Sequence, residues 1–266
     1  MGLPDELFIY RLIILILVVS FAVALILILK GKKDQKASFT EQTDELIRKM
    51  KSQKNLSGNI VSIVAELIEH RDKDTGGHID RTTSYVSVLV LAMKDSGVYA
   101  DELNKWNLKT AIASSRLHDV GKIGVSDLIL NKPDKLTSEE FEKMKSHASQ
   151  GVQIIEQIID KTGDEEFLAS AKLFAESHHE RWDGAGYPKG LKGEEIPLQS
   201  RIMAVVDVYD ALTSKRPYKP AFPHEKAVEI IMEGKGKQFD PAIVDVFFTM
   251  HGQFDDLREI FSYTHL

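Results

Sequence analysis

The residues best suited to chemistry in this 266-residue chain are histidines and aspartates, and they occur in clusters. His118 and Asp119 are adjacent, with Gly121 shortly after them, and His178 and His179 are adjacent at the end of an apolar helical pattern. Imidazole and carboxylate groups together suit iron, manganese, zinc or nickel. Burying neighbouring histidines is costly unless something compensates their polar atoms, and a shared divalent ion would do so.

An aspartate within an apolar helical pattern adds to these clusters. Asp207 interrupts a run of apolar residues, and Asp210 follows it on the same helical face. An unpartnered carboxylate would be expensive in such a place, so Asp207 joins the expected ligands. Two metal ions about 3.5–4 Å apart, bridged by a carboxylate, form an arrangement that hydrolyses phosphoesters.

The other histidines are weaker candidates. His78 follows a pair of glycines, and His147 lies midway along a predicted helix. A lone histidine is more often a surface residue than a ligand. His224, His251 and His265 have no clustered partners in the sequence, and we expect them to be ordinary.

Composition excludes several other classes of protein. The chain has no cysteine, so disulfides, Cys-bound zinc, iron–sulfur clusters and thiol nucleophiles are excluded. A hydrophobic content of 43% supports a packed core. The net charge of −6 is not that of a protein that coats nucleic acid, so we expect no nucleic-acid polymer as a partner.

The N-terminal part contains a candidate membrane anchor. Residues 12–29 carry no charge, and as a helix they would span about 27 Å, close to the thickness of a bilayer core. A signal peptide would have a basic start and a cleavage site, whereas this segment follows Asp5 and Glu6 and ends in lysines. We therefore predict a transmembrane helix at residues 8–30, a single pass through the inner (cytoplasmic) membrane. Because Lys30, Lys32, Lys33 and Lys36 follow the run, the remainder is expected in the cytoplasm.

Residues 31–58 form a polar linker with two open interpretations. Leu46, Met50 and Val64 fall on one helical stripe, which would suit a parallel stalk that makes a homodimer. Gln53 and Ser57 occupy the same stripe, which favours a solvated juxtamembrane helix.

Residues 59–266 are expected to form an all-α domain. Apolar residues recur at helical spacing through most of this segment, and no stretch alternates with period two for long enough to be a strand. Glycine and proline cluster in Asp183–Pro197, which predicts one long loop. The helices are expected at 60–69, 82–93, 109–117, 138–159, 165–178, 197–212 and 225–232.

Two motifs resemble those of the HD-GYP domain, a branch of the HD superfamily of metal-dependent phosphohydrolases. The segment 118–122 reads HDVGK, and 178–188 reads HHERWDGAGYP, in the family's order. The segments 207–213 and 216–219 also match, and the resemblance covers about residues 60–248. It implies an HD-type helical bundle with a GYP loop, acting as a cyclic di-GMP phosphodiesterase.

The resemblance also implies a set of metal ligands. One ion would be held by His78, His118, Asp119 and Asp207. A second would be held by Asp119, His147, His178 and His179, with Asp119 bridging. Asp74 stands where some family members use a glutamate for a third ion, so two or three divalent ions are expected, iron or manganese foremost. The shorter carboxylate puts that third ion, and the production of GMP that accompanies it, in question.

The same resemblance places residues around the substrate. Lys122 would lie beside the metals, and Arg216 and Lys219 would hold phosphates. Asp210 would orient Lys122 or a water. Tyr187 could be a lid, a guanine contact or part of a surface for a partner, and Gly184 and Gly186 are expected to adopt positive φ. These residues, with Asp119 as the catalytic carboxylate, complete the expected site.

Three functions remain open from the sequence. The favoured one is hydrolysis of cyclic di-GMP to pGpG, and on to GMP if a third ion binds, by a hydroxide between two metals. Another cyclic dinucleotide could be the substrate instead, because such a site reads phosphate more than base. The third is a non-catalytic module that binds cyclic di-GMP or a GGDEF-type protein, and the presence of the metal-site residues argues against it.

Overall fold

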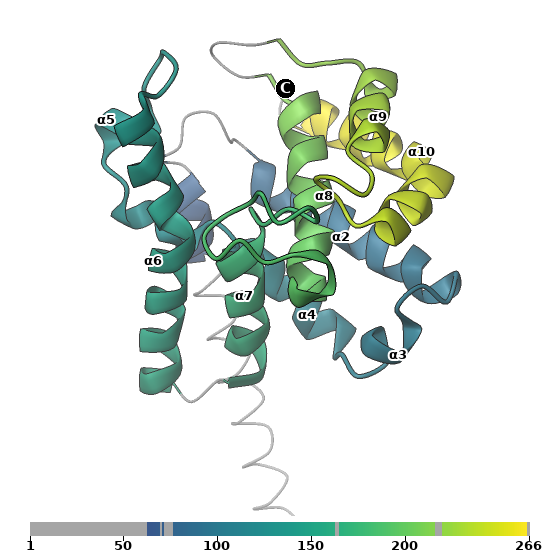
Figure 1. Ribbon diagram of the computed structural model, residues 1–266, viewed down its shortest axis with the longest axis horizontal. Coiled ribbons are helices and arrows are strands. Elements are labelled where there is room, and N and C mark those ends of the chain that lie inside the picture. Colours follow the sequence, from purple (N-terminus) through teal and green to yellow (C-terminus); the bar gives the residue numbers. More distant parts are fainter. Residues whose placement is uncertain (1–62, 70, 72–76, 163–164, 216–219, 265–266) are drawn as a thin grey trace, which may run out of the picture. The chain divides into compact units, whose positions relative to one another are not determined.

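The computed structural model describes residues 63–69, 71, 77–162, 165–215 and 220–264 (Figure 1). The chain divides into Met1–Gly58 and Asn59–Leu266, and all described residues belong to the second unit. The expected anchor at 8–30 and linker at 31–58 lie outside the described residues. Among the helices that are described, none has the length and apolar character needed to cross a bilayer.

Within the described part of the chain, helices and the loops that join them make up the fold, apart from an isolated bridge between Lys235 and Phe239. This confirms the expected all-α fold. Residues 63–69 are helical. The named elements are α2 (His78–Asp95), α3 (Ala100–Leu103), α4 (Leu108–Ser114), η1 (Ser115–Leu117), η2 (Val120–Gly124), α5 (Asp127–Leu130), α6 (Ser138–Thr162), α7 (Glu165–Ser177), η3 (Gly193–Glu195), α8 (Leu198–Thr213), α9 (His224–Glu233) and α10 (Pro241–Thr264).

One apolar cluster joins α2, α8, α9 and α10. Its centre is aromatic: Tyr85 stacks on Phe254 with ring centroids 4.7 Å apart, and Tyr209 meets both rings edge-on. Aromatic pairs of this geometry add to the stabilisation from burial alone. The cluster holds α8 in the interior, and most of that helix is buried.

A second, smaller cluster joins residues 63–69 to α6 and α7. Ala65, Ile155 and Ala171 are buried there, and their small or branched side chains let the helices approach closely. Figure 1 shows α6 and α7 side by side, with α8 next to α7. Both clusters therefore supply helices to the region where the candidate ligands lie.

The longest helix that the sequence analysis missed is α10. The sequence carries a signal for the start of this helix, because Asp240 directly precedes Pro241. In the structure, Oδ1 of Asp240 accepts a hydrogen bond from the backbone N–H of Ala242 at 2.9 Å. Buried Val244, Phe247 and Phe254 then follow at helical spacing. The short α3 and α5 were also missed, since four-residue helices leave too little periodicity to detect.

Candidate metal centre and substrate cleft

The structure brings the predicted ligands together from separate elements. They are His78 at the start of α2, His118 and Asp119 between η1 and η2, His147 in α6, His178 and His179 just after α7, and Asp207 in α8. Asp74 lies outside the described residues. The site thus depends on contacts between distant segments of the chain.

A close approach between η2 and α6 fixes the position of Asp119. A Cβ on Gly121 would collide with the backbone of His147 and Gly151, so only glycine lets the two segments meet. Gly121 lies in η2, one of the two tight turns that follow α4. Its larger role is to place Asp119 next to His147.

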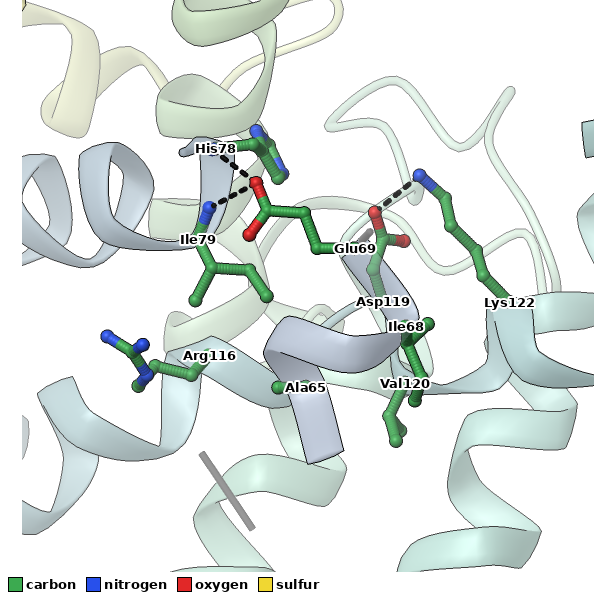
Figure 2. Close-up of a pocket in the computed structure, with 9 residues that line it drawn as sticks. All are labelled: Ala65, Ile68, Glu69, His78, Ile79, Arg116, Asp119, Val120 and Lys122. Atoms are coloured by element: carbon green, nitrogen blue, oxygen red, sulfur yellow. Dashed lines mark hydrogen bonds and ion pairs between the residues drawn. The ribbon is translucent and has the colours of Figure 1, made fainter. Parts of the chain in front are cut away.

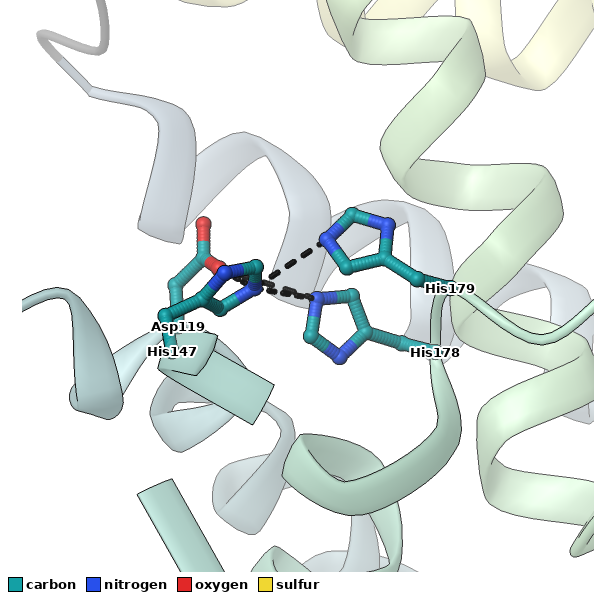
Figure 3. A group of neighbouring side chains, drawn as sticks. All are labelled: Asp119, His147, His178 and His179. Carbon is teal, nitrogen blue, oxygen red and sulfur yellow. Dashed lines mark hydrogen bonds and ion pairs between the residues drawn. The ribbon is translucent and has the colours of Figure 1, made fainter. Parts of the chain in front are cut away.

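Asp119, His147, His178 and His179 form one group of converging donor atoms (Figure 3). Oδ1 of Asp119 lies 3.4 Å from Nε2 of His147 and 3.6 Å from Nε2 of His178. Nε2 of His179 lies 3.1 Å from Nε2 of His147. One atom from each residue lies within 4.8 Å of the others, a spacing that a single metal ion can bridge.

His78, His118 and Asp119 form a second group that shares the same carboxylate. Nε2 of His78 lies 3.2 Å from Nε2 of His118, and Oδ2 of Asp119 lies 3.4 Å from Nε2 of His118. Oδ1 of Asp207 lies 3.7 Å from Nε2 of His78, which adds a second carboxylate. The two oxygens of Asp119 therefore face different groups.

Hydrogen bonds fix the tautomers of several histidines. Nδ1 of His118, His147 and His178 each faces a backbone carbonyl, at 3.0, 2.7 and 3.1 Å, and so donates its proton there. The Nε2 atoms of His147 and His178 then face each other with their lone pairs, 3.5 Å apart, which is unfavourable unless a cation lies between them. Oδ1 of Asp119 is also buried without a hydrogen-bond donor among the described residues. These donor atoms fit a divalent metal ion.

Lys122 lies beside the shared carboxylate. Its Nζ is 2.8 Å from Oδ2 of Asp119. Burial alone would raise the pKa of Asp119, but chiefly the positive charge of Lys122 holds it well below its ordinary value. Asp119 is therefore ionised and ready to bind a cation. The expected place of Lys122 next to the ligands agrees with this geometry.

Asp210 has two partners that the sequence analysis did not name, His78 and Arg81. It is buried, and its Oδ2 accepts from Nδ1 of His78 at 2.8 Å while Arg81 donates to both of its oxygens at 2.6 and 3.0 Å. Burial opposes ionisation, but His78 and Arg81 lower the pKa of Asp210 to about 2. Asp210 therefore holds His78 from behind, and the expectation that it orients Lys122 or a water stays a prediction. The sequence analysis also missed Arg81, although it is one helical turn from His78.

Glu69 is another residue that the sequence analysis missed. Its Oε1 accepts from the backbone N–H groups of His78 and Ile79, at 2.5 and 3.4 Å, and so caps the start of α2 (Figure 2). It lines a pocket of about 300 Å³ with Asp119 and Lys122. Burial raises the pKa of Glu69. Its place after an apolar helical stretch carries no sequence signal for this role.

The GYP loop is anchored by Glu180. This buried carboxylate accepts hydrogen bonds from the backbone N–H groups of Lys189, Gly190 and Leu191, at 2.6, 3.1 and 3.1 Å. Gly184 has a φ of 83°, as predicted. The same prediction for Gly186 is wrong: its φ is not positive, and glycine is needed there because a Cβ would collide with the backbone from His179 to Arg181.

Tyr187 lies over the metal-ligand group. Its ring stacks on His179, with centroids 4.7 Å apart and an angle of 28° between the planes. Burial raises the pKa of the Tyr187 hydroxyl. The loop and α8 line an open cleft of about 780 Å³, which also contains His179 and Asp207. The cleft is the route by which a substrate could reach these ligands.

Arg216 and Lys219 lie outside the described residues, so their expected phosphate contacts stay predictions.

His224 and His251 were expected to be ordinary residues without clustered partners, but the structure brings them into contact. Nε2 of His224 lies 2.9 Å from Nδ1 of His251, and Nδ1 of His224 lies 2.8 Å from the Tyr209 hydroxyl. These residues come from α8, α9 and α10, and no local pattern links them.

An all-helical domain in which two histidine groups share one aspartate is suited to holding divalent metal ions. The chain belongs to the family described as "HD domain". The model of this family matches residues 62–243. Membership of this family implies binding of divalent metal, and it agrees with the His/Asp groups. The resemblance to its HD-GYP branch is confirmed.

Curated relatives agree with this family. The chain is 49% identical over 195 residues to a "Cyclic di-GMP phosphodiesterase" of Vibrio cholerae, covering 73% of this chain and 39% of the relative. It is 41% identical over 219 residues to a "Probable cyclic di-GMP phosphodiesterase" of the same organism, covering 82% and 50%. A "3'3'-cGAMP-specific phosphodiesterase 2" from Vibrio cholerae is 35% identical over 216 residues, covering 81% and 39%. The chain thus spans half or less of the length of these relatives.

Proposed function

We propose that this chain is a metal-dependent phosphodiesterase that hydrolyses cyclic di-GMP to linear pGpG. The observation that carries the proposal is the position of Asp119, whose two oxygens face separate histidine groups. A carboxylate placed in this way suits a pair of ions, and two ions with an open cleft suit the hydrolysis of a phosphodiester. The names of the relatives at up to 49% identity support cyclic di-GMP as the substrate.

We propose that two divalent ions, iron or manganese, occupy the two groups. His78, His118, Asp119 and Asp207 would hold one ion, and Asp119, His147, His178 and His179 the other. When bound, such ions lower the pKa of a coordinated water and neutralise phosphate charge. A third ion that uses Asp74 would extend the product from pGpG to GMP.

The protein's own side chains have defined tasks in this proposal. Asp119 holds its negative charge because Lys122 lies 2.8 Å away. The Lys122 ammonium is placed to neutralise a phosphate oxygen that reaches the site. Arg216 and Lys219 would hold the substrate phosphates. Tyr187, stacked on His179, covers one side of the ligand group.

A second candidate substrate is a hybrid cyclic dinucleotide. The similarity to a relative named as 3'3'-cGAMP-specific favours keeping it, at 35% identity. Groups that bind phosphate through cations do not themselves distinguish guanine from adenine. A non-catalytic receptor for cyclic di-GMP or a GGDEF-type protein is the further alternative.

We propose that residues 8–30 anchor the chain in the inner membrane by a single pass, with the catalytic domain in the cytoplasm. The uncharged run at 12–29 and the lysines after it support this orientation. A homodimer through residues 31–58 is part of the same proposal, and a GGDEF-type protein is a candidate partner.

The test uses the full chain, purified in detergent without chelator. Metal content is measured by elemental analysis, and products from cyclic di-GMP and 3'3'-cGAMP are separated by chromatography. We expect two or more metals per chain and pGpG from cyclic di-GMP. In Asp119→Ala, both metal content and turnover should be lost. Hydrolysis that survives in Asp119→Ala would overturn the two-ion proposal, and turnover of 3'3'-cGAMP alone would favour the second candidate.

A further inference from the structure

One wall of the substrate cleft carries a lysine that no predicted motif includes. Lys145 lies in α6 and lines the cleft with Tyr187, Arg181 and Asp207. Its side chain is 27% exposed, so the ammonium is partly shielded but open to the cleft. Because His147 follows two residues later in α6, Lys145 belongs to the same rigid element as a candidate metal ligand.

Aromatic rings hold Lys145 in place. Its Nζ lies 5.1 Å from the centre of the Phe141 ring and 5.5 Å from that of Tyr187. The two rings meet edge-on with centroids 6.3 Å apart, and Tyr187 in turn stacks on His179. These contacts form a continuous wall from the ligand group to the ammonium, and cation–π contact favours the charge at this position.

Among the described residues that line the cleft, the cation besides Lys145 is Arg181, and it is already paired. Arg181 donates from Nε and Nη2 to the two oxygens of Asp183, at 3.1 and 2.7 Å. That bidentate pair also lowers the pKa of Asp183, so the carboxylate keeps its charge. Lys145 instead contacts one oxygen of Glu142 at 2.6 Å, and Glu142 is 70% exposed. A solvated pair of this kind is weak and can be exchanged for a phosphate.

The proposed substrate has a use for such a cation. A cyclic dinucleotide carries two phosphodiesters, and only one of them can lie at the ligand groups during hydrolysis. The other keeps its negative charge and lies a nucleoside away, where solvent or a protein cation must balance it. A lysine at the cleft wall, with aromatic faces beside it, matches an anionic phosphate flanked by nucleosides.

We propose that Lys145, positioned by Phe141 and Tyr187, binds the phosphodiester that is not being cut. The inference rests on the proposed function, because it assumes a substrate with two phosphates. It assigns the α6 wall to recognition of the distal half of the dinucleotide. It also explains why Tyr187 contacts both a candidate ligand and a lysine.

The test compares two substrates in the full, metal-loaded chain. Cyclic di-GMP has a second phosphate, whereas bis(4-nitrophenyl) phosphate has only the phosphodiester that is cut. In Lys145→Met we expect KM for cyclic di-GMP to rise about tenfold, with a much smaller change in kcat, since a partly exposed charged contact is lost. The loss should be larger for cyclic di-GMP than for the aryl diester. Lys145→Arg should restore most of the affinity.

Lys143→Met is the matched control, because Lys143 is exposed on the same helix and does not line the cleft. It should behave as wild type on both substrates. Equal losses on both substrates in Lys145→Met, or an unchanged KM for cyclic di-GMP, would overturn the inference alone. Wild-type protein that cuts the aryl diester but not cyclic di-GMP would overturn the proposed function and the inference with it.

Discussion

Nδ1 of His78 lies 2.8 Å from Oδ2 of Asp210, across a buried contact between α2 and α8. Burial opposes protonation of His78, but the hydrogen bond and charge of Asp210 raise its pKa overall. The contact also fixes the ring, because Nδ1 is held by Asp210 while Nε2 faces His118. A carboxylate behind a ligating histidine sets both its tautomer and its orientation.

Asp210→Asn should therefore weaken metal binding without removing any direct ligand. The amide has no charge to pair with Arg81, and its single oxygen cannot accept from both His78 and Arg81 as the two carboxylate oxygens do. We expect the affinity for Mn²⁺ to fall about tenfold to a hundredfold, measured by competition with a chromophoric chelator. Asp160→Asn, on the exposed side of α6, is the charge-matched control. Unchanged affinity in a folded Asp210→Asn protein would contradict the positioning role.

Gly186→Ala should disrupt the GYP loop. The added methyl group would collide with backbone atoms of Glu180 and Arg181, which cannot yield as a flexible side chain can. Overpacking of this kind costs about 1–3 kcal/mol in the free energy of unfolding. We expect turnover to fall as well, because Tyr187 follows directly.

Gly252→Ala is the contrasting variant for that measurement. Gly252 lies within α10, and nothing would contact its Cβ. Alanine should stabilise the protein there by about 0.5–1 kcal/mol, since glycine is a poor helix former. Urea denaturation of the two variants should therefore give shifts of opposite sign. A Gly186→Ala protein as stable and active as wild type would show that the loop can move aside.

Metal should stabilise the folded chain. The Nε2 atoms of His147 and His178 lie 3.5 Å apart, and their lone pairs repel each other. A cation bound between these atoms relieves that repulsion, and it can do so only in the folded state. Removal of metal with EDTA should lower the melting temperature, and added Mn²⁺ should restore it. At a free concentration of 100 times Kd, the expected stabilisation is about 2.7 kcal/mol. In Asp119→Ala the melting temperature should respond far less to either treatment.

The His224–His251 contact predicts a pH dependence of stability. Burial lowers the pKa of His224, and His251 adds to this effect, while Asp255 and Glu225 oppose it. The neutral form is thus favoured by folding, so its contribution to stability is complete above about pH 6.5 and is lost as pH falls. His224→Asn should show a shallower loss of melting temperature than wild type between pH 7.5 and 5.5. Parallel curves would contradict this assignment.

The sequence could predict the ligand set because rare residue types occur in a specific order. His118 and Asp119, and His178 and His179, are neighbours in the chain, so a resemblance to known motifs identifies them without knowledge of packing. The all-α fold was predictable for a similar reason, since apolar residues recur at helical spacing through α6, α7 and α8. Helix α10 shows the limit of prediction from the sequence. Its apolar residues recur at helical spacing, but the helix contains none of the motifs and was therefore missed.

The sequence by itself determined the helical class, the long loop and the chemical type of the site. Only the tertiary structure decided which side chain meets which: Asp210 lies behind His78, and Lys145 lies against the ring of Tyr187. Helical periodicity says which residues share a face of one helix, but not which residue of another helix packs against that face. That choice depends on how distant helices fit together, and it therefore emerges only when the whole core is assembled.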